Sequence, residues 1–558
     1  MSRLSDAARG AFDLLIVGGG IVGAGIARDA ALRGLRVALF ELADFGSGTT
    51  AGSTRLVHGG LRYLEMLDFR LVRMDLRERE RLLRNAPHLV RPLEFLVPVY
   101  GRNPFARWKL ALGMLLYDLL SFDKSLPGRR WLTREQVAQA EPQLEARHLQ
   151  GAATYYDAQV ELPERLCLEN LIDAREHGAL TFNYAEVIQA LGSDGRVTGL
   201  RVRDVLSGEQ TDVLGRAVVN AAGPWFDRVA ARLMPSTPPR LRTTKGIHLA
   251  CPRVTRRALV LYSRVDRRLF FAIPWLGYTW VGTTDTDFAE EPGRANATRE
   301  DAEYLMRSAR EFLPALASEQ ALFSNAGVRA LLVEEGSASS VSRQHVVIDE
   351  AGSGRPGLIS VVGGKLTGYR AIAEEATNAV CRRLGIVSEC RTCDRPLPGA
   401  REAAHPIPPA AGVGQATVDH LVSLYGSRGA EVLRIAATDA ELAQPLAPDT
   451  PDIAAQVVFS VRAEQCLRVS DFLLRRTRLG FAPDQGRRAL PRVAAWMARE
   501  LGWDDARRQA ECDAYLAHVA RTQEFRAVGR KAAAAASGRT SPASGPDACA
   551  ASPGAAAE

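Results

Sequence analysis

The sequence predicts an α/β fold: a Rossmann-like nucleotide-binding domain with an interleaved antiparallel substrate-side sheet, followed by a C-terminal all-helical domain. Three observations predict this class. Residues 12–41 have the pattern strand, glycine turn, helix, strand; residues 241–282 contain successive strand-like runs; and residues 415–524 are dominated by helical patterns.

The first strand and its turn carry the strongest local signal. Residues 14–17 form a short apolar run, as a parallel strand covered on both faces requires. Gly18, Gly20 and Gly23 then follow the G-x-G-x-x-G spacing. In that pattern the first glycine permits the turn, the second lets a pyrophosphate approach the backbone, and the third packs helix against strand.

The helix and second strand complete the nucleotide-binding pattern. We expect a helix over residues 24–34, whose N-terminus offers N–H groups to phosphates, and a strand over 37–40. Glu41 ends that strand, where a carboxylate accepts hydrogen bonds from ribose hydroxyls. This context favours dinucleotide binding over a chance glycine turn, but it does not separate FAD from NAD.

Length and composition set broad limits. A chain of 558 residues is too long for one core, and 46% hydrophobic with 24% charged residues is ordinary for a globular protein. A net charge of +7 suits an anionic substrate or an acidic membrane surface. There is no secretory signal, no apolar run long enough to span a bilayer and no nucleic-acid motif.

The eight cysteines are scattered, which indicates reduced thiols and not a disulfide framework. Cys390 and Cys393 form one C-x-x-C pair. A metal or cluster site needs further ligands at suitable spacing, and none is near in the sequence. We therefore expect no metal and treat the pair as incidental.

Residues 105–122 have basic residues near their start and an apolar middle. They are too short to span a bilayer but could lie in its interface. The alternative is a buried core helix, which residue pattern alone does not distinguish.

A second strand, glycine and helix sequence follows later in the chain. An apolar strand at 217–220 ends in small residues, which let a ligand approach the backbone closely. Residues 358–362 then form a strand that meets Gly363 and Gly364, and a helix starts beyond Lys365 and Thr367. This places a second helix N-terminus and a cation near bound anionic groups.

The expected domains are 1–400 for nucleotide and substrate binding, 401–529 for the helical domain, and a disordered tail at 530–558 that is rich in Ala, Ser, Gly and Pro. Residues 475–481 could form a structural, docking or membrane-facing helix; the structural role is favoured, with the arginines as its wet face.

Taken together, the motifs resemble one family, the FAD-dependent, membrane-associated (aerobic) glycerol-3-phosphate dehydrogenases. The matching stretches keep the family's order over about the first 525 residues. They include DLLIVGGGIVGAGIARDAALRGL, LVHGGLRYLE, NAAGPW, KGIHL, VGTTD, GVR at 327–329, VVGGKLTGYR and DFLLRRTRLGF.

The resemblance implies FAD as cofactor and assigns residues to it. FAD contacts are expected at Gly18, Gly19, Gly20, Gly23, Glu41, Thr49, Thr50, His58, Gly59, Gly223, Gly363, Gly364, Lys365, Leu366 and Thr367. The substrate phosphate would be held by Arg62, Arg329 and Lys365, with Tyr63 and His248 on the substrate face of the flavin.

The roles within this site are hypotheses with alternatives. His248 is the candidate general base, because a neutral imidazole accepts a proton near pH 7; otherwise it only hydrogen-bonds cofactor or product. His58 is the competing histidine. Arg329 is expected to anchor substrate, whereas Lys365 could hold either substrate or the flavin.

The implied reaction is oxidation of sn-glycerol 3-phosphate to dihydroxyacetone phosphate by hydride transfer to FAD, with electrons passed to a membrane quinone and so to the respiratory chain. The resemblance also implies a peripheral position on the cytoplasmic membrane face, and a homodimer is left open. Two rivals remain: a soluble amino-acid-type flavin oxidase that uses oxygen, and a non-catalytic FAD-binding redox sensor.

Overall fold

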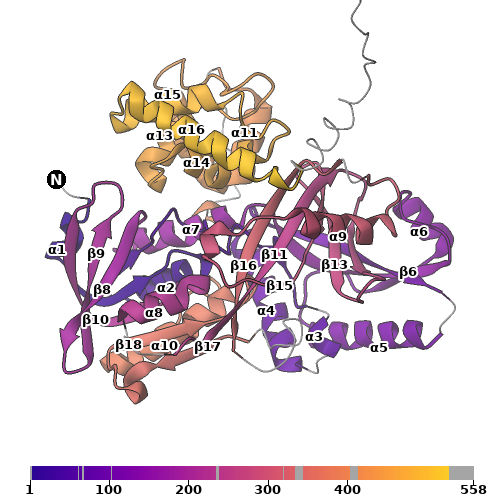
Figure 1. Cartoon of the computed structure of the whole chain (residues 1–558), viewed down its shortest axis with the longest axis horizontal. Coiled ribbons are helices and arrows are strands. Elements are labelled where there is room, and N and C mark those ends of the chain that lie inside the picture. Colours follow the sequence, from indigo (N-terminus) through magenta and orange to yellow (C-terminus); the bar gives the residue numbers. More distant parts are fainter. Residues whose placement is uncertain are drawn as a thin grey trace, which may run out of the picture.

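The computed structural model describes most of the chain, and within it two sheets lie side by side under a group of C-terminal helices (Figure 1). The described residues are 3–60, 62–65, 68–101, 104–233, 238–317, 320–333, 344–401 and 412–526. The side chains of 62, 65 and 104–106 are also outside this description. The proposed tail at 530–558 lies outside the described residues.

The first sheet has eight strands and is parallel at its centre. Its main order is β17-β18-β10-β1-β2-β7, with β8 and β9 as an antiparallel extension of β10. The strands are β1 (Ala11–Val17), β2 (Val37–Phe40), β7 (Leu180–Phe182), β8 (Ala185–Ser193), β9 (Arg196–Asp204), β10 (Gln210–Asn220), β17 (Val346–Asp349) and β18 (Leu358–Val362). The predicted strands at 14–17, 37–40, 217–220 and 358–362 all lie in this sheet.

Helices pack against both faces of this sheet, which buries its apolar strands on both sides. Helices α2 (Ile21–Leu32), α7 (Pro163–Glu176) and α10 (Tyr369–Leu384) share one core with β1 and β2. On the other face, α1 (Ser5–Arg9) and α8 (Phe226–Leu233) pack with the β8–β9 extension. This is the layered arrangement that the alternating strand and helix pattern predicts.

Helix α2 begins three residues earlier than expected, at Ile21 instead of residue 24. Gly20 is extended and forms the N-cap, and the Thr50 hydroxyl accepts a hydrogen bond from the Ile21 N–H at 3.0 Å. A side chain distant in sequence therefore satisfies the first turn, which the local pattern could not reveal.

The second sheet has ten strands and is mostly antiparallel. Its main order is β15-β11-β14-β13-β12-β4-β6-β3, with β16 paired to β11 and β5 to β6. The strands are β3 (Leu56–Val57), β4 (Val90–Tyr100), β5 (Arg130–Thr133), β6 (Leu149–Val160), β11 (Leu241–Pro252), β12 (Ala258–Tyr262), β13 (Leu269–Trp275), β14 (Tyr278–Gly282), β15 (Thr286–Asp287) and β16 (Phe323–Leu332). Its strands alternate along the chain with those of the first sheet, so the interleaving is confirmed.

Five further helices accompany the second sheet: α3 (Arg62–Glu65), α4 (Phe69–Asn85) and α5 (Pro104–Leu120) on one side, and α6 (Arg134–Ala140) and α9 (Arg299–Arg310) on the other. The C-terminal helices are α11 (Gln415–Tyr425), α12 (Gly429–Ala436), α13 (Ala454–Glu464), α14 (Val469–Asp471), α15 (Leu490–Leu501) and α16 (Asp505–Arg521). They share their own core, but the boundary at residue 401 stays a proposal. Among the described residues, no helix is both long and apolar enough to cross a bilayer.

Candidate active site

A cavity of about 970 Å³ opens between the two sheets, and residues from both of them line it. The carboxyl ends of β1, β2, β10 and β18 supply one side, whereas β16 and the loop before β3 supply the other. The volume is large for a single small substrate and suits a cofactor together with its substrate. The crevice beyond the carboxyl ends of parallel strands is where α/β folds bind nucleotides.

The first glycine turn is shaped for a ligand that lies against its backbone. Gly18 has φ +107°, and a Cβ there would lie 2.6 Å from the Ala221 carbonyl oxygen. A Cβ on Gly23 would lie 1.9 Å from the Gly18 oxygen, so this glycine packs helix against strand. A Cβ on Gly20, by contrast, would have only Thr50 Oγ1 at 3.5 Å for a neighbour. Gly20 is therefore open toward the cavity, as close approach of a pyrophosphate requires.

Glu41 stands at the end of β2 and lines the cavity. Its two oxygens accept hydrogen bonds from the Gly19 N–H at 2.7 Å and the Ala43 N–H at 2.8 Å. These bonds fix the carboxylate while burial raises its pKa. A carboxylate accepts about four hydrogen bonds, so acceptor capacity remains for ribose hydroxyls.

The second glycine turn faces the same cavity. Gly363 and Gly364 have φ +76° and +107°, a conformation that favours glycine. Beyond them, the Thr367 hydroxyl accepts from the His58 N–H at 3.0 Å and donates to the His58 carbonyl oxygen at 3.2 Å. This pair of bonds joins the loop before α3 to the loop before α10, so two distant motifs form one wall.

The residues fit FAD, because an open glycine turn, a fixed carboxylate and a second backbone wall surround a cavity of suitable size. Of the expected cofactor residues, most line the cavity: Gly18, Gly20, Glu41, Thr49, Thr50, His58, Gly223, Gly363, Gly364, Lys365, Leu366 and Thr367. Gly19, Gly23 and Gly59 lie behind this wall. Gly19 donates to Glu41, and the Gly59 N–H donates to the Tyr117 hydroxyl at 3.0 Å, so these glycines support the wall without lining it.

Lys365 is held at the cavity by two groups on the second sheet's side. Its Nζ lies 2.6 Å from Asp75 Oδ2 and 3.6 Å from the centre of the Tyr63 ring. Burial raises the pKa of Asp75 to about 6, even though Lys365 acts to lower it. The carboxylate on α4 therefore positions the ammonium group, and Tyr63 and Lys365 both line the cavity as expected.

Arg329 reaches the cavity from β16. Its Nη2 donates to Thr283 Oγ1 at 2.8 Å, and its Nη1 donates to the Thr284 carbonyl at 3.2 Å and to Asp285 Oδ1 at 3.1 Å. These contacts orient the guanidinium, whose planar donors match a phosphate. Arg62 begins α3 beside Tyr63, but its side chain lies outside the described residues.

His248 is not among the residues that line the cavity but lies directly behind Thr54, so its expected place on the substrate face of the flavin stays a prediction. Its ring stacks on Trp280 at 5.3 Å, and its Nε2 lies 3.0 Å from Thr54 Oγ1, which does line the cavity. Burial, with Arg329 and Arg55, lowers the pKa of His248 to about 3. The imidazole is therefore a weak base at neutral pH, and its contact with the cavity runs through the Thr54 hydroxyl.

The C-terminal helical region contributes residues that sequence reasoning missed. Arg475, Arg468 and His518 line the cavity from that region. Arg475 and Arg476 are also buried, and both donate to Asp44, which follows β2. The expectation of a wet arginine face is wrong, because two guanidiniums share one buried carboxylate. Only the contact with Asp44, which lies 431 positions before Arg475 in the sequence, shows that these arginines are buried.

Two known protein families match this chain. The family described as FAD dependent oxidoreductase matches residues 13–370. The family described as the C-terminal domain of alpha-glycerophosphate oxidase matches residues 390–508.

Individual relatives cover nearly the whole chain. A glycerol-3-phosphate dehydrogenase of Synechocystis is 39% identical over 90% of this chain and 94% of its own length. The aerobic glycerol-3-phosphate dehydrogenase of Bacillus subtilis is 34% identical over 90% and 93%. A crystal structure of the Bacillus halodurans glycerol-3-phosphate dehydrogenase complexed with FAD superposes with a TM-score of 0.77 at 29% identity, covering 93% of this chain and 96% of that one.

Proposed function

This chain belongs to the family of FAD-dependent glycerol-3-phosphate dehydrogenases, and on that premise we propose that it oxidises sn-glycerol 3-phosphate to dihydroxyacetone phosphate and delivers the electrons to a membrane quinone. When bound, FAD supplies the acceptor for the hydride that leaves the substrate carbon. The protein's part is to hold the phosphate, orient the reacting carbon and exclude water.

One observation carries the substrate assignment: two oriented cations from different sheets line the cavity that the glycine turns also line. Arg329 comes from β16 and Lys365 from the loop after β18, and each is held by a carboxylate, Asp285 or Asp75. Two such cations suit a phosphate dianion better than a single carboxylate, which supports a phosphate ester over an amino acid. Fixing the phosphate converts remote binding energy into orientation of the reacting carbon.

In this proposal His248 acts as a positioning residue for Thr54. The imidazole holds the Thr54 hydroxyl at the cavity wall, from where the hydroxyl can hydrogen-bond the substrate oxygen. A histidine with a pKa of about 3 adds little proton affinity near pH 7, so its main contribution is geometric.

The outer face of α5 supports contact with a membrane. Four apolar side chains of α5 and one just beyond its end, at alternating spacings of four and three, form one exposed stripe, which we call the α5 stripe: Trp108, Leu112, Leu115, Leu119 and Phe122. Met114 and Tyr117 on the opposite side are buried, so this is an amphipathic helix whose apolar outer face is exposed in the described part of the chain. Arg107 and Lys109, both exposed, stand at its start. Such a face suits the interface of an anionic bilayer, where quinone resides.

The inner side of the same helix touches the proposed active site. The Tyr117 hydroxyl accepts from Gly59 and donates to Asp157 Oδ2 at 2.7 Å, and Gly59 follows His58 of the cavity wall. Helix α5 thus stands between the α5 stripe and the cavity wall, and the helix lies on the side of the molecule opposite the C-terminal helices (Figure 1). This supports, as part of the proposal, electron delivery at the cytoplasmic membrane face.

The test is electron transfer to quinone in a membrane. The purified holoenzyme is mixed with vesicles that contain ubiquinone or menaquinone, and quinol formation is followed after glycerol 3-phosphate is added. We expect quinol formation that exceeds hydrogen peroxide formation and that requires vesicles. If oxygen were reduced at full rate while quinone stayed oxidised, the oxidase alternative would replace the quinone part of this proposal.

A further inference from the structure

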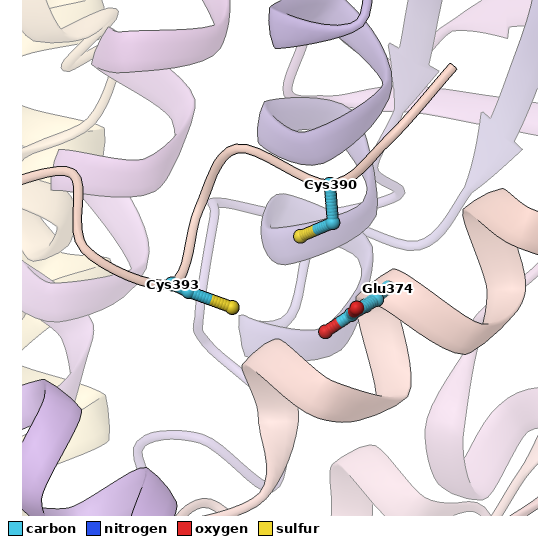
Figure 2. A group of neighbouring side chains, drawn as sticks. All are labelled: Glu374, Cys390 and Cys393. Carbon is cyan, nitrogen blue, oxygen red and sulfur yellow. The ribbon is translucent and has the colours of Figure 1, made fainter.

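We propose that Glu374, Cys390 and Cys393 form a binding site for one Zn²⁺ ion, outside the flavin cavity and independent of the proposed reaction. Glu374 lies on α10, and the two cysteines lie in the loop that leads from α10 toward the C-terminal helices. Figure 2 shows their three side chains converging on one small space between the helix and the loop. None of the three lines the cavity.

The geometry suits zinc after small side-chain adjustments. The two Sγ atoms and one Glu374 oxygen all lie within 4.8 Å of one another, and each residue is half-buried. In a tetrahedral zinc site with Zn–S bonds of about 2.3 Å, neighbouring sulfurs stand about 3.8 Å apart. A C-x-x-C pair is a common way to supply two such ligands, and water can take the fourth position.

The protein holds the cysteine loop in this position. Asn85 Nδ2 donates to the Cys393 carbonyl oxygen at 2.8 Å, which ties the loop to α4. The Thr392 hydroxyl receives a hydrogen bond from Arg370 Nη1 at 3.1 Å and lies 3.1 Å from Cys390 Sγ. Because Asn85 holds the loop backbone and Arg370 holds the Thr392 side chain, binding an ion would cost little additional conformational entropy in this loop.

Arg370 gives the site a second set of contacts. Its Nη1 donates to Glu374 Oε2 at 2.8 Å and lies 3.5 Å from Cys390 Sγ. Its Nε and Nη2 each donate to Glu78 at 2.7 Å, so Glu78 already offsets its charge. A hydrogen bond to a ligating carboxylate orients it without displacing it, as the outer partners of metal ligands do.

The ligand set selects the kind of ion. Two thiolates with one carboxylate favour a soft or borderline cation such as Zn²⁺, whereas Ca²⁺ and Mg²⁺ require oxygen ligands. An iron–sulfur cluster needs more cysteines, and this is the one group of three potential ligands found within the described part of the chain. The sequence-based expectation that Cys390 and Cys393 are incidental did not consider Glu374, which lies sixteen positions before Cys390 on α10.

A bound ion would join α10 to the loop that leaves it. Helix α10 begins at Tyr369, five positions after Gly364 of the cofactor wall, so the ion would link the helix that follows this wall to the connection with the C-terminal helices. This is a structural site, and we expect Zn²⁺ to raise the thermal midpoint of unfolding.

The experiment measures metal content. Full-length FAD-loaded protein is reduced, incubated with ZnCl₂, desalted and analysed by elemental mass spectrometry. We expect one zinc per chain, near-complete loss in C390S/C393S, and affinity lowered at least about tenfold in E374Q. C512S is the matched control, because Cys512 is a half-buried free cysteine on α16, and it should retain zinc fully. With CoCl₂, the wild type and C512S should show a thiolate-to-cobalt charge-transfer band, and C390S/C393S should not.

Circular dichroism and FAD content verify that each variant folds. The proposal is overturned if folded wild-type protein retains no zinc after reduction, or if C390S/C393S retains as much as the wild type. The isolated protein could also have a mass two hydrogen atoms below that of the reduced protein and take up no zinc after reduction. That result would instead identify the pair as a redox-active disulfide.

Discussion

The α5 stripe yields a prediction whose size can be worked out. We consider replacing Leu112 and Leu119 by serine, because these leucines are 65% and 61% exposed and lie two turns apart on the outer face of α5. Neither side chain supports the protein core strongly. The double variant L112S/L119S should therefore fold and bind FAD as the wild type does, while losing affinity for membranes.

The magnitude follows from the apolar surface that the bilayer would cover. Full burial of a leucine side chain contributes about 2 kcal/mol, so the exposed fraction of each leucine leaves about 1.2 kcal/mol to be gained at the membrane. Together the two substitutions remove about 2.4 kcal/mol, which corresponds to roughly 50-fold weaker partitioning.

The assay is co-flotation with vesicles of phosphatidylethanolamine and phosphatidylglycerol at low ionic strength. L214S/V265S is the matched control, because these two apolar residues are also exposed, at 59% and 53%, but lie on β10 and on the turn between β12 and β13. The control should partition as the wild type does. Equal partitioning by L112S/L119S and the wild type would refute the assignment of α5 as the membrane-binding face.

Three further variants test the site and its support. R329Q should lower kcat/KM for glycerol 3-phosphate by about 10- to 100-fold in steady-state assays, mainly by raising KM, because charge-assisted bonds to the phosphate are lost. R329K should recover part of the lost kcat/KM. A KM for R329Q equal to that of the wild type would exclude a contact between Arg329 and the substrate. His248 has a folded pKa of about 3 against about 6.5 when unfolded, so the native state binds fewer protons between these values. His248 should thus contribute up to about 5 kcal/mol to the loss of wild-type stability as pH drops through that window, and H248Q should lose less by that amount in denaturant titrations; parallel curves would contradict the burial of this imidazole. Although burial raises the pKa of Asp44, its contacts with Arg476 and Arg475 lower that pKa to about 2. D44N leaves both arginines without this carboxylate and should therefore lower the free energy of unfolding by about 3–5 kcal/mol. D212N is the control: it removes a carboxylate from an exposed ion pair and should change stability little.

Local patterns predicted the cofactor half of the fold well. The apolar run at 14–17, the glycine spacing and Glu41 lie within about thirty residues, so their geometry depends on contacts between near neighbours. Gly20, Glu41 and Gly363 accordingly line the cavity as expected. The separation into two sheets also followed from composition, since buried parallel strands and alternating antiparallel strands have different patterns.

Features set by contacts between distant residues could not be predicted in this way. The burial of Arg475 and Arg476 depends on Asp44, and the position of His248 behind Thr54 depends on the packing of β11 against the loop before β3. Likewise, no local signal connects Lys365 with Asp75 on α4. In each case the side chain's surroundings come from a segment far away in sequence, and residue type alone leaves several roles open.

The central claim, that the paired cations select a phosphate ester for oxidation at FAD, is tested most directly by anaerobic bleaching of the flavin absorbance. Purified holoenzyme is mixed in a stopped-flow instrument with glycerol 3-phosphate, glycerol, lactate or a D-amino acid. The proposal predicts fast bleaching by glycerol 3-phosphate alone. Bleaching by the amino acid, or no bleaching by any of the four while FAD remains bound, would contradict it.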